Sequence, residues 1–176
     1  MEGLLGTLDQ NPESGEGDES TSPSSVPTHI PWQSLLRAIP VKAPGWTIEG
    51  KPTGRIAQIM GVSVSQVNCA LRQDKLTAEI QVIDTMMNPL IAMPFDMAHA
   101  VEIDSAKERI SPITLGRQPA TQKYHKRRQE AEVLIMVENR ILVKIDVQGA
   151  ANETPAVELG GSLDMALLSE LAGGQE

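Results

Sequence analysis

The sequence predicts an α+β fold in which an antiparallel β-sheet of about six strands carries packed helices. Two hairpin patterns and an intervening helical pattern lead to this prediction. In the clearest hairpin, apolar residues alternate with others over 131–137 and 141–147, on either side of Asn139-Arg140. A period of two is typical of strands, and a short polar break between two such runs indicates a hairpin. We expect this hairpin at the centre of the sheet.

The remaining elements follow in chain order. Residues 62–84 predict a second hairpin around the polar triplet Gln73-Asp74-Lys75, and 55–60 predict a strand before it. From 88 to 101 the apolar residues recur at steps of three and four, which indicates a helix that covers one face of the sheet. We predict further strands at 105–115 and 120–124. Short helices are expected at 31–39, 152–159 and 163–171.

The N-terminal part of the chain differs sharply in composition from the rest. Residues 1–30 are rich in Gly, Ser, Pro and acidic residues, and such a stretch cannot bury enough apolar surface to offset the entropy of ordering. We therefore predict a disordered acidic tail at 1–30 and a single α+β domain at 31–176. Leu4, Leu5 and Leu8 have the spacing of one helical face, so they form either a short docking motif on a tether or a frayed end.

Charge and cysteine content limit the function classes. The 176 residues carry a formal net charge of -8, which disfavours general binding of nucleic acids. A single cysteine rules out an internal disulfide. No apolar run approaches the roughly 20 residues of a membrane span, and we find neither a signal peptide nor a lipid-attachment cysteine. We expect a soluble, cytoplasmic protein.

The strongest charge feature is a basic segment that precedes the central hairpin. It could contact an acidic partner, an anionic surface or the acidic tail of its own chain, or it could be a solvated loop. The candidate binding residues are Lys123, Tyr124, His125, Lys126, Arg127 and Arg128.

Candidates for catalysis or metal binding are weak. Cys69 shares a predicted strand face with Val67 and Leu71, which favours a buried inert thiol over a nucleophile. Asp96 and His99 stand three residues apart on the predicted helix and could offer two metal ligands, but an ordinary polar face explains them as well. The methionines of 86–97 suit either a core or an adaptable binding surface, and we favour the core.

Several short motifs occur along the domain. They are Gly45-Trp46, Ile83-Asp84, the turn of Gly116, Pro119 and Ala120 before Lys123-Tyr124, Asn139-Arg140, and Leu163, Asp164 and Leu168. Together they resemble a family of small uncharacterised bacterial proteins in the PsbP-like, Ran-binding Mog-type α/β/α sandwich group, over roughly 41–172. The resemblance implies a PsbP-like sandwich and non-enzymatic accessory or binding roles, and it supplies no catalytic motif.

These observations favour a non-enzymatic accessory or protein-binding module, part of a larger assembly, with the acidic tail as a tether. We expect no cofactor and a protein partner, and an edge strand could pair two copies of the chain. Two alternatives stay open. One is a small metal-dependent hydrolase using Asp96 and His99, and the other is a binder of anionic surfaces or nucleic acid through 123–128.

Overall fold

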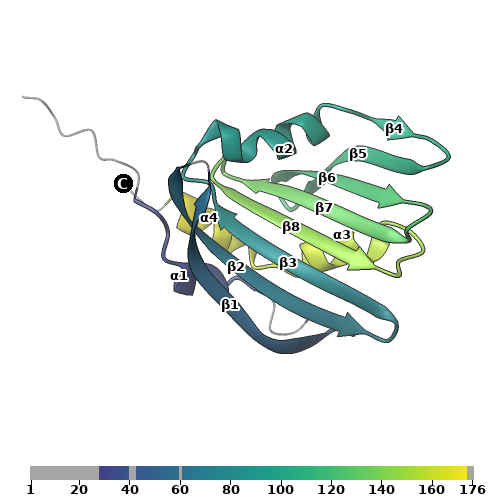
Figure 1. Cartoon of the computed structure of the whole chain (residues 1–176), viewed down its shortest axis with the longest axis horizontal. Helices are drawn as coiled ribbons and strands as arrows, with labels where there is room; N and C mark the ends of the chain where they lie inside the picture. Colours follow the sequence, from purple (N-terminus) through teal and green to yellow (C-terminus); the bar gives the residue numbers. More distant parts are fainter. Residues whose placement is uncertain (1–27, 40–42, 60, 174–176) are drawn as a thin grey trace, which may run out of the picture.

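The computed structural model describes residues 28–39, 43–59 and 61–173. Within these residues, eight strands form an antiparallel sheet in the order β1-β2-β3-β8-β7-β6-β5-β4 (Figure 1). The strands are β1 (Thr47–Ile59), β2 (Val62–Gln73), β3 (Leu76–Asp84), β4 (Ile103–Asp104), β5 (Glu108–Leu115), β6 (Gln118–His125), β7 (Glu130–Val137) and β8 (Ile141–Gln148). The helices are α1 (Trp32–Leu36), α2 (Pro89–His99), α3 (Thr154–Gly161) and α4 (Met165–Gly173).

The hairpin of β7 and β8 lies in the middle of the sheet, as its alternating pattern predicted. Between the strands, Glu138 and Asn139 both adopt positive φ angles, of 49° and 54°. Positive φ at two successive turn residues matches the twist of the flanking strands, which closes a tight connection. The amide of Arg140 then donates to the carbonyl of Val137 over 3.0 Å.

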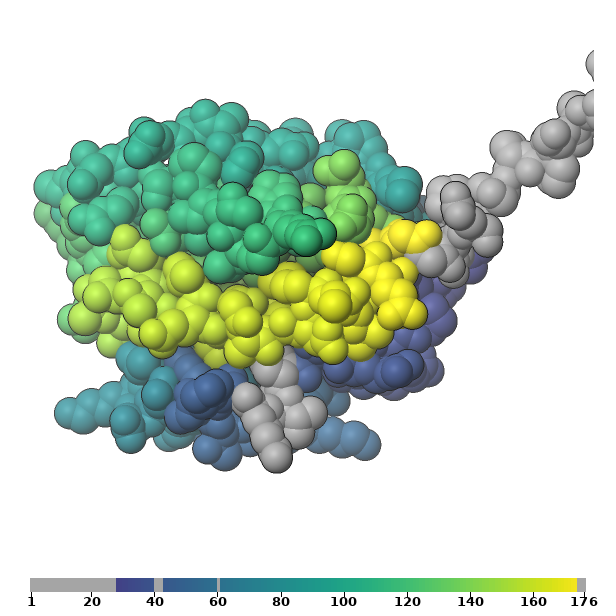
Figure 2. Space-filling model, turned by 180° about the vertical axis from the view of Figure 1, so that it is seen from behind, coloured from purple at the N-terminus to yellow at the C-terminus, as the bar shows by residue number. Residues whose placement is uncertain are grey.

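The helices divide unequally between the two faces. We call the face that α2 covers the front, which is turned to the viewer in Figure 1, and the opposite face the back. Helices α3 and α4 run across the back, with α1 beside α4 (Figure 2). The large core lies between these helices and the sheet. Every second side chain of β8 is fully buried there, namely Ile141, Val143, Ile145 and Val147.

The front face has a smaller apolar area. Phe95 of α2 packs with Leu134, Met136 and Leu142 of the central hairpin. Ile91, one turn earlier, packs with Val64 and Ile83. Beyond α2, the front residues of the same strands are polar. The helices therefore cover much more of the back of the sheet than of the front, where α2 is the covering helix.

The expected sheet of about six strands is wrong, because the structure has eight, and we do not propose the PsbP-like sandwich again. Strand β1 was predicted at 55–60 and begins at Thr47, so it is longer than expected but adds nothing to the number of strands, whereas β4 does. Gly50 and Pro52, residue types that are uncommon within strands, fall in the added part of β1. In the structure a register shift between Glu49 and Thr53, with Gly50 at a φ of 72°, absorbs them and lets the strand continue. The two-residue strand β4 was too short to predict.

Most of the predicted acidic tail, 1–27, lies outside the described residues. Residues 28–30, which the sequence analysis placed in the tail, lie against the domain, where the side chain of Ile30 is 2% exposed. The edges of the sheet are β1 and β4, so the pairing of two copies through an edge strand stays a prediction. In the part of the chain that the structure describes, no helix has the length and hydropathy needed to cross a membrane.

Candidate functional site

Helix α2 is the element that shapes the candidate site. It starts at Asn88, whose side-chain oxygen accepts a hydrogen bond from the amide of Leu90 over 2.9 Å, and Pro89 occupies the first turn. Both features are typical of a helix start. Ile91 and Phe95 are the buried residues of α2, and they fix it across the front of the sheet. The helix thus presents its other sides to solvent.

An apolar stripe lies on the exposed side of α2. Leu90, Met93 and Met97 are 55%, 46% and 65% exposed, and Val101 continues the same spacing beyond the helix. Scattered surface apolar residues are ordinary, but a contiguous row of them marks an interaction site. The stripe shows that our preference for a methionine core was wrong here, since Met87, Met93 and Met97 are all exposed.

A groove of about 570 Å³ lies between α2 and the front of the sheet, and we call it the α2 groove. Helix α2 forms one wall with Leu90, Ile91, Pro94 and Ala98. Apolar residues also come from the strands, namely Ile59, Ile83, Ile110, Leu134 and Leu142. Clefts of this size with mostly apolar walls are where proteins hold ligands and partner segments.

Polar side chains from the sheet also line the α2 groove. They are Gln81, Lys123, Glu132 and Lys144, from four adjacent strands of the sheet. Lys144 lies 3.3 Å from Glu132 and 3.1 Å from Asp146. The groove is therefore apolar along α2 and mixed along the sheet, where charged side chains lie among apolar ones, and this suits an amphipathic occupant.

Two of the charged groups in the groove have an altered pKa. Burial raises the pKa of the Glu132 carboxyl, and the neighbouring charge of Asp146 adds to this, although Lys144 acts in the opposite direction. Burial by itself would lower the pKa of Lys144, but its hydrogen bond to Asp146 and the charge of Glu132 outweigh burial and leave it raised. Both pKa shifts follow from the same geometry. Lys144 has two carboxylate partners, whereas Glu132 shares the single ammonium of Lys144 with Asp146.

The basic segment 123–128 does not form a single cluster. Lys123, midway along β6, lines the α2 groove. The hydroxyl of Tyr124 is buried on the back, where it donates to the carbonyl of Ala150 over 3.0 Å. His125 lies 3.5 Å from Glu108, and Lys126 lies 2.8 Å from Asp104. Tyr124, His125 and Lys126 are therefore engaged in contacts within the domain.

Arg127 and Arg128 remain exposed in the turn after β6. With Lys107, Glu108 and His125 they line a shallow hollow of about 250 Å³. Arg128 lies 3.8 Å from Glu130. Lys123 and His125 lie on the same side of β6, and both approach the carboxylate of Glu108. The α2 groove, which Lys123 lines, and the hollow, which His125 lines, therefore adjoin at Glu108.

The remaining candidates have structural roles. Cys69 is buried, and this burial raises the pKa of its thiol, which opposes formation of a nucleophilic thiolate. The His99 ring stacks on Phe95 at 5.2 Å, and its Nδ1 atom lies 3.2 Å from both the Ala120 carbonyl and the Thr121 hydroxyl. Within the described ranges, no three His, Cys, Asp or Glu side chains come together as a metal site.

Sequence reasoning missed the α2 groove. The helical spacing of 88–101 was recognised, but it assigned Leu90, Met93 and Met97 to the covered side together with Ile91. One usable signal was present, since the apolar residues of this segment occupy more than one helical stripe.

Comparison of the chain with models of protein families and with curated protein sequences finds no match. The resemblance described above therefore stays a prediction.

Proposed function

We propose that this protein is a non-enzymatic protein-binding module that holds an amphipathic segment of a partner protein in the α2 groove. The α2 groove, with apolar residues from α2 and the sheet and a few charged side chains from the sheet, is the observation that carries this proposal. An amphipathic helix of about three turns, roughly 16 Å long, matches the length of the 11-residue α2 that forms the wall. Its apolar side would face Leu90 and Pro94.

Two lysines of the groove offer contacts to acidic residues on the polar side of a partner segment. The residues that line the groove include two ammonium groups, Lys123 and Lys144, and the carboxylate of Glu132. Glu108 and Asp146, next to the groove, also lie close to these lysines. A segment that leaves the groove past Lys123 would next meet His125 and Arg127 along the same strand and turn. This arrangement keeps part of the predicted 123–128 site in the proposal, as the exit of the groove. The module would act as an accessory within a larger assembly.

The exposed methionines support the same reading. Methionine side chains are unbranched and polarizable, so a stripe of them adapts to partners of varied shape. Met93 and Met97 flank the groove on the solvent side of α2 and would enlarge the contact surface beyond it. The alternatives of a metal-dependent hydrolase and an anionic-surface binder gain no comparable observation, so we do not develop them.

A peptide-display selection on the full chain tests the proposal. We expect the selected peptides to share apolar residues at steps of three and four, with acidic residues between them. Leu90→Glu places a charge on the apolar wall and should weaken such a peptide about tenfold or more. Because an acidic residue in the first turn of a helix is favourable, this variant should fold normally.

Ile56→Glu is the matched control, because Ile56 is 54% exposed, like Leu90 at 55%, but lies on β1 outside the groove. We expect it to bind the selected peptides within about twofold of the unchanged chain. Equal weakening by both substitutions would contradict the proposal. So would an enzymatic turnover that is lost on Asp96→Ala or His99→Ala.

A further inference from the structure

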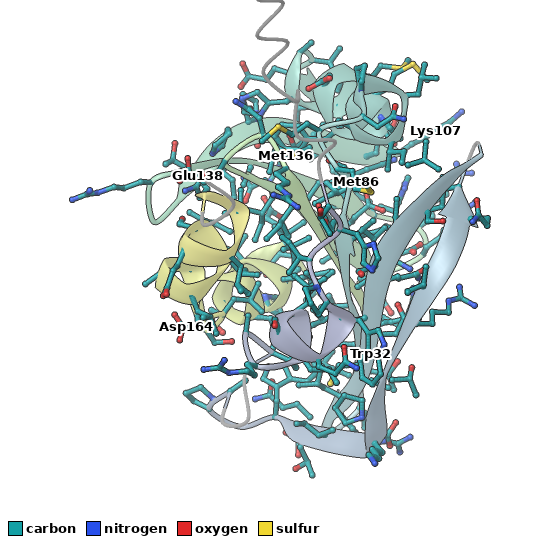
Figure 3. All side chains as sticks on the ribbon, turned by 90° about the vertical axis from the view of Figure 1, so that its left-hand side faces the viewer. Trp32, Met86, Lys107, Met136, Glu138 and Asp164 are labelled. Carbon is teal, nitrogen blue, oxygen red and sulfur yellow. The ribbon has the colours of Figure 1, made fainter. Side chains whose placement is uncertain are left out.

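The described chain begins at the end of the sheet where the α2 groove starts. Arg140 donates through Nη2 to the carbonyl of Thr28 over 2.7 Å, and the amide of Ile30 donates to Asp84 Oδ2 over 2.6 Å. Asp84 directly follows Ile83, which lines the groove, and its Oδ1 accepts from the amide of Met86 in the connection to α2. Figure 3 looks onto this end of the molecule, with Met86 and Met136 labelled.

The sequence before this point contains an apolar cluster with acidic neighbours. Leu4 and Leu8 are four residues apart and Leu5 adjoins them, which is the spacing of one helical face. Residues 1–27 contain no Lys or Arg. Their acidic residues are Glu2, Asp9, Glu13, Glu16, Asp18 and Glu19. This is the chemistry that the groove favours, with apolar residues for α2 and acidic ones for Lys123 and Lys144.

The chain length permits the contact. Twenty residues separate Leu8 from Thr28, and a chain of that length spans at most about 70 Å when extended. The groove runs beside a helix roughly 16 Å long, so every part of it lies within reach. For a tethered segment of this kind the effective concentration is on the order of millimolar, which lets even a weak contact form within one chain.

We propose that Leu4, Leu5 and Leu8 dock in the α2 groove of their own chain and compete with the partner segment for it. The competition rests on the proposed function, whereas the docking does not. The N-terminal segment would act as an internal competitor, so a partner must bind more tightly than the tethered leucines to enter. The predicted tail would then regulate the site instead of only tethering the domain.

Disulfide trapping in the full chain tests the docking. Leu5→Cys is combined with Leu90→Cys on the groove wall, or with Ile56→Cys, which is as exposed but lies on β1 outside the groove. Because the native Cys69 is buried, we expect it to form no disulfide with the introduced cysteines. Under mild oxidation of dilute protein we expect the Leu90→Cys pair to form an intramolecular disulfide at least about fivefold faster than the Ile56→Cys pair. Equal rates would overturn the proposal.

A second measurement needs no new cysteine. The full-length triple variant Leu4→Ser, Leu5→Ser and Leu8→Ser is compared with the unchanged chain by methyl NMR. We expect shift changes at Ile83, Leu134 and Leu142, which line the groove, and none at Ile145 in the back core. Unchanged spectra would overturn the docking, yet would leave peptide binding to the groove intact as a separate result.

The competition has its own readout. The triple serine variant should bind a selected groove peptide about tenfold more tightly than the unchanged chain, because no internal segment has to be displaced. Equal affinity would overturn the competition. If no peptide binds the groove at all but the Leu90→Cys disulfide still forms quickly, the proposed function fails while the docking stands.

Discussion

The carboxylate of Asp84 and the guanidinium of Arg140 form a buried ion pair at the end of the sheet. Arg140 Nε lies 3.0 Å from Asp84 Oδ1, and Nη2 lies 3.3 Å from Oδ2. The two side chains are 0% and 3% exposed. Asp84 also accepts from the amides of Ile30 and Met86, so the pair joins the first described residues, the end of β3 and the turn between β7 and β8.

The first prediction concerns this pair. Replacing Arg140 with Met removes one partner and leaves the carboxylate of Asp84 buried without its cation. Loss of one member of a buried pair costs about 3–5 kcal/mol of the free energy of unfolding. Urea unfolding followed by circular dichroism measures it. The exposed pair of Arg72 and Glu49 is the control, since Arg72→Gln should cost at most about 1 kcal/mol. Similar losses for the two substitutions would contradict the structural role of the buried pair.

The second prediction concerns the contact of α1 with β1. A Cβ atom at Gly54 would overlap the indole ring of Trp32, which lies between α1 and the strands (Figure 3). Gly54→Ala should therefore push α1 away from the sheet and destabilise the fold by about 1–3 kcal/mol. Gly161→Ala is the matched control, because a Cβ there meets no atom within 4 Å. A thermal melt of Gly54→Ala that coincides with that of the control would show that Trp32 moves aside freely.

The third prediction separates structure from binding in the 123–128 segment. Tyr124→Phe keeps the ring but removes the hydroxyl that donates to the Ala150 carbonyl. A buried acceptor that loses its donor costs about 1–3 kcal/mol. We expect this loss in urea unfolding, with peptide binding to the α2 groove unchanged at temperatures where the variant is folded. If the variant kept its full stability but bound the peptide more weakly, Tyr124 would instead belong to the binding site.

The fourth prediction is a pH dependence. Because burial raises the pKa of Glu132 in the folded state, its neutral form is favoured there, and this contribution to stability is lost as pH rises through the folded pKa. The Glu132→Gln variant has no carboxyl group to ionise at this position, so it does not lose this stability as pH rises. The free energy of unfolding of the variant, minus that of the unchanged chain, should therefore be larger at pH 7.5 than at pH 4. Glu170→Gln, on the exposed surface of α4, controls for the loss of one negative charge. If this difference in the free energy of unfolding fell as pH rises, the raised pKa of Glu132 would be contradicted.

Local patterns in the sequence predicted much of the sheet. The alternation over 131–137 and 141–147 specified both the central hairpin and its buried side, because side chains on a strand alternate between the two faces. The break at 73–75 located the β2–β3 turn in the same way. Local patterns failed where a strand contains an irregularity. The sequence analysis began β1 only at residue 55, but pairing with β2 carries the strand across the bulge between Glu49 and Thr53.

The candidate site could be predicted only in part. Its helix was predicted, and Lys123 was among the candidate residues, but the groove was not. Spacing alone marked Leu90, Ile91 and Met93 as equally apolar. Which of them is covered depends on where α2 lies on the sheet, and that position is set by the contacts of Phe95 with Leu134, Met136 and Leu142.

The sequence by itself therefore determined the hairpins, the helices and the acidic composition of 1–27, because each depends on neighbours within a few residues. The tertiary structure decided the order of the strands, the exposed side of α2 and the pairing of Asp84 with Arg140. These two residues are 56 positions apart, and they meet because β3 pairs with β8. Contacts of that kind depend on which strands become neighbours, and the alternation of side chains is the same whichever neighbour a strand has.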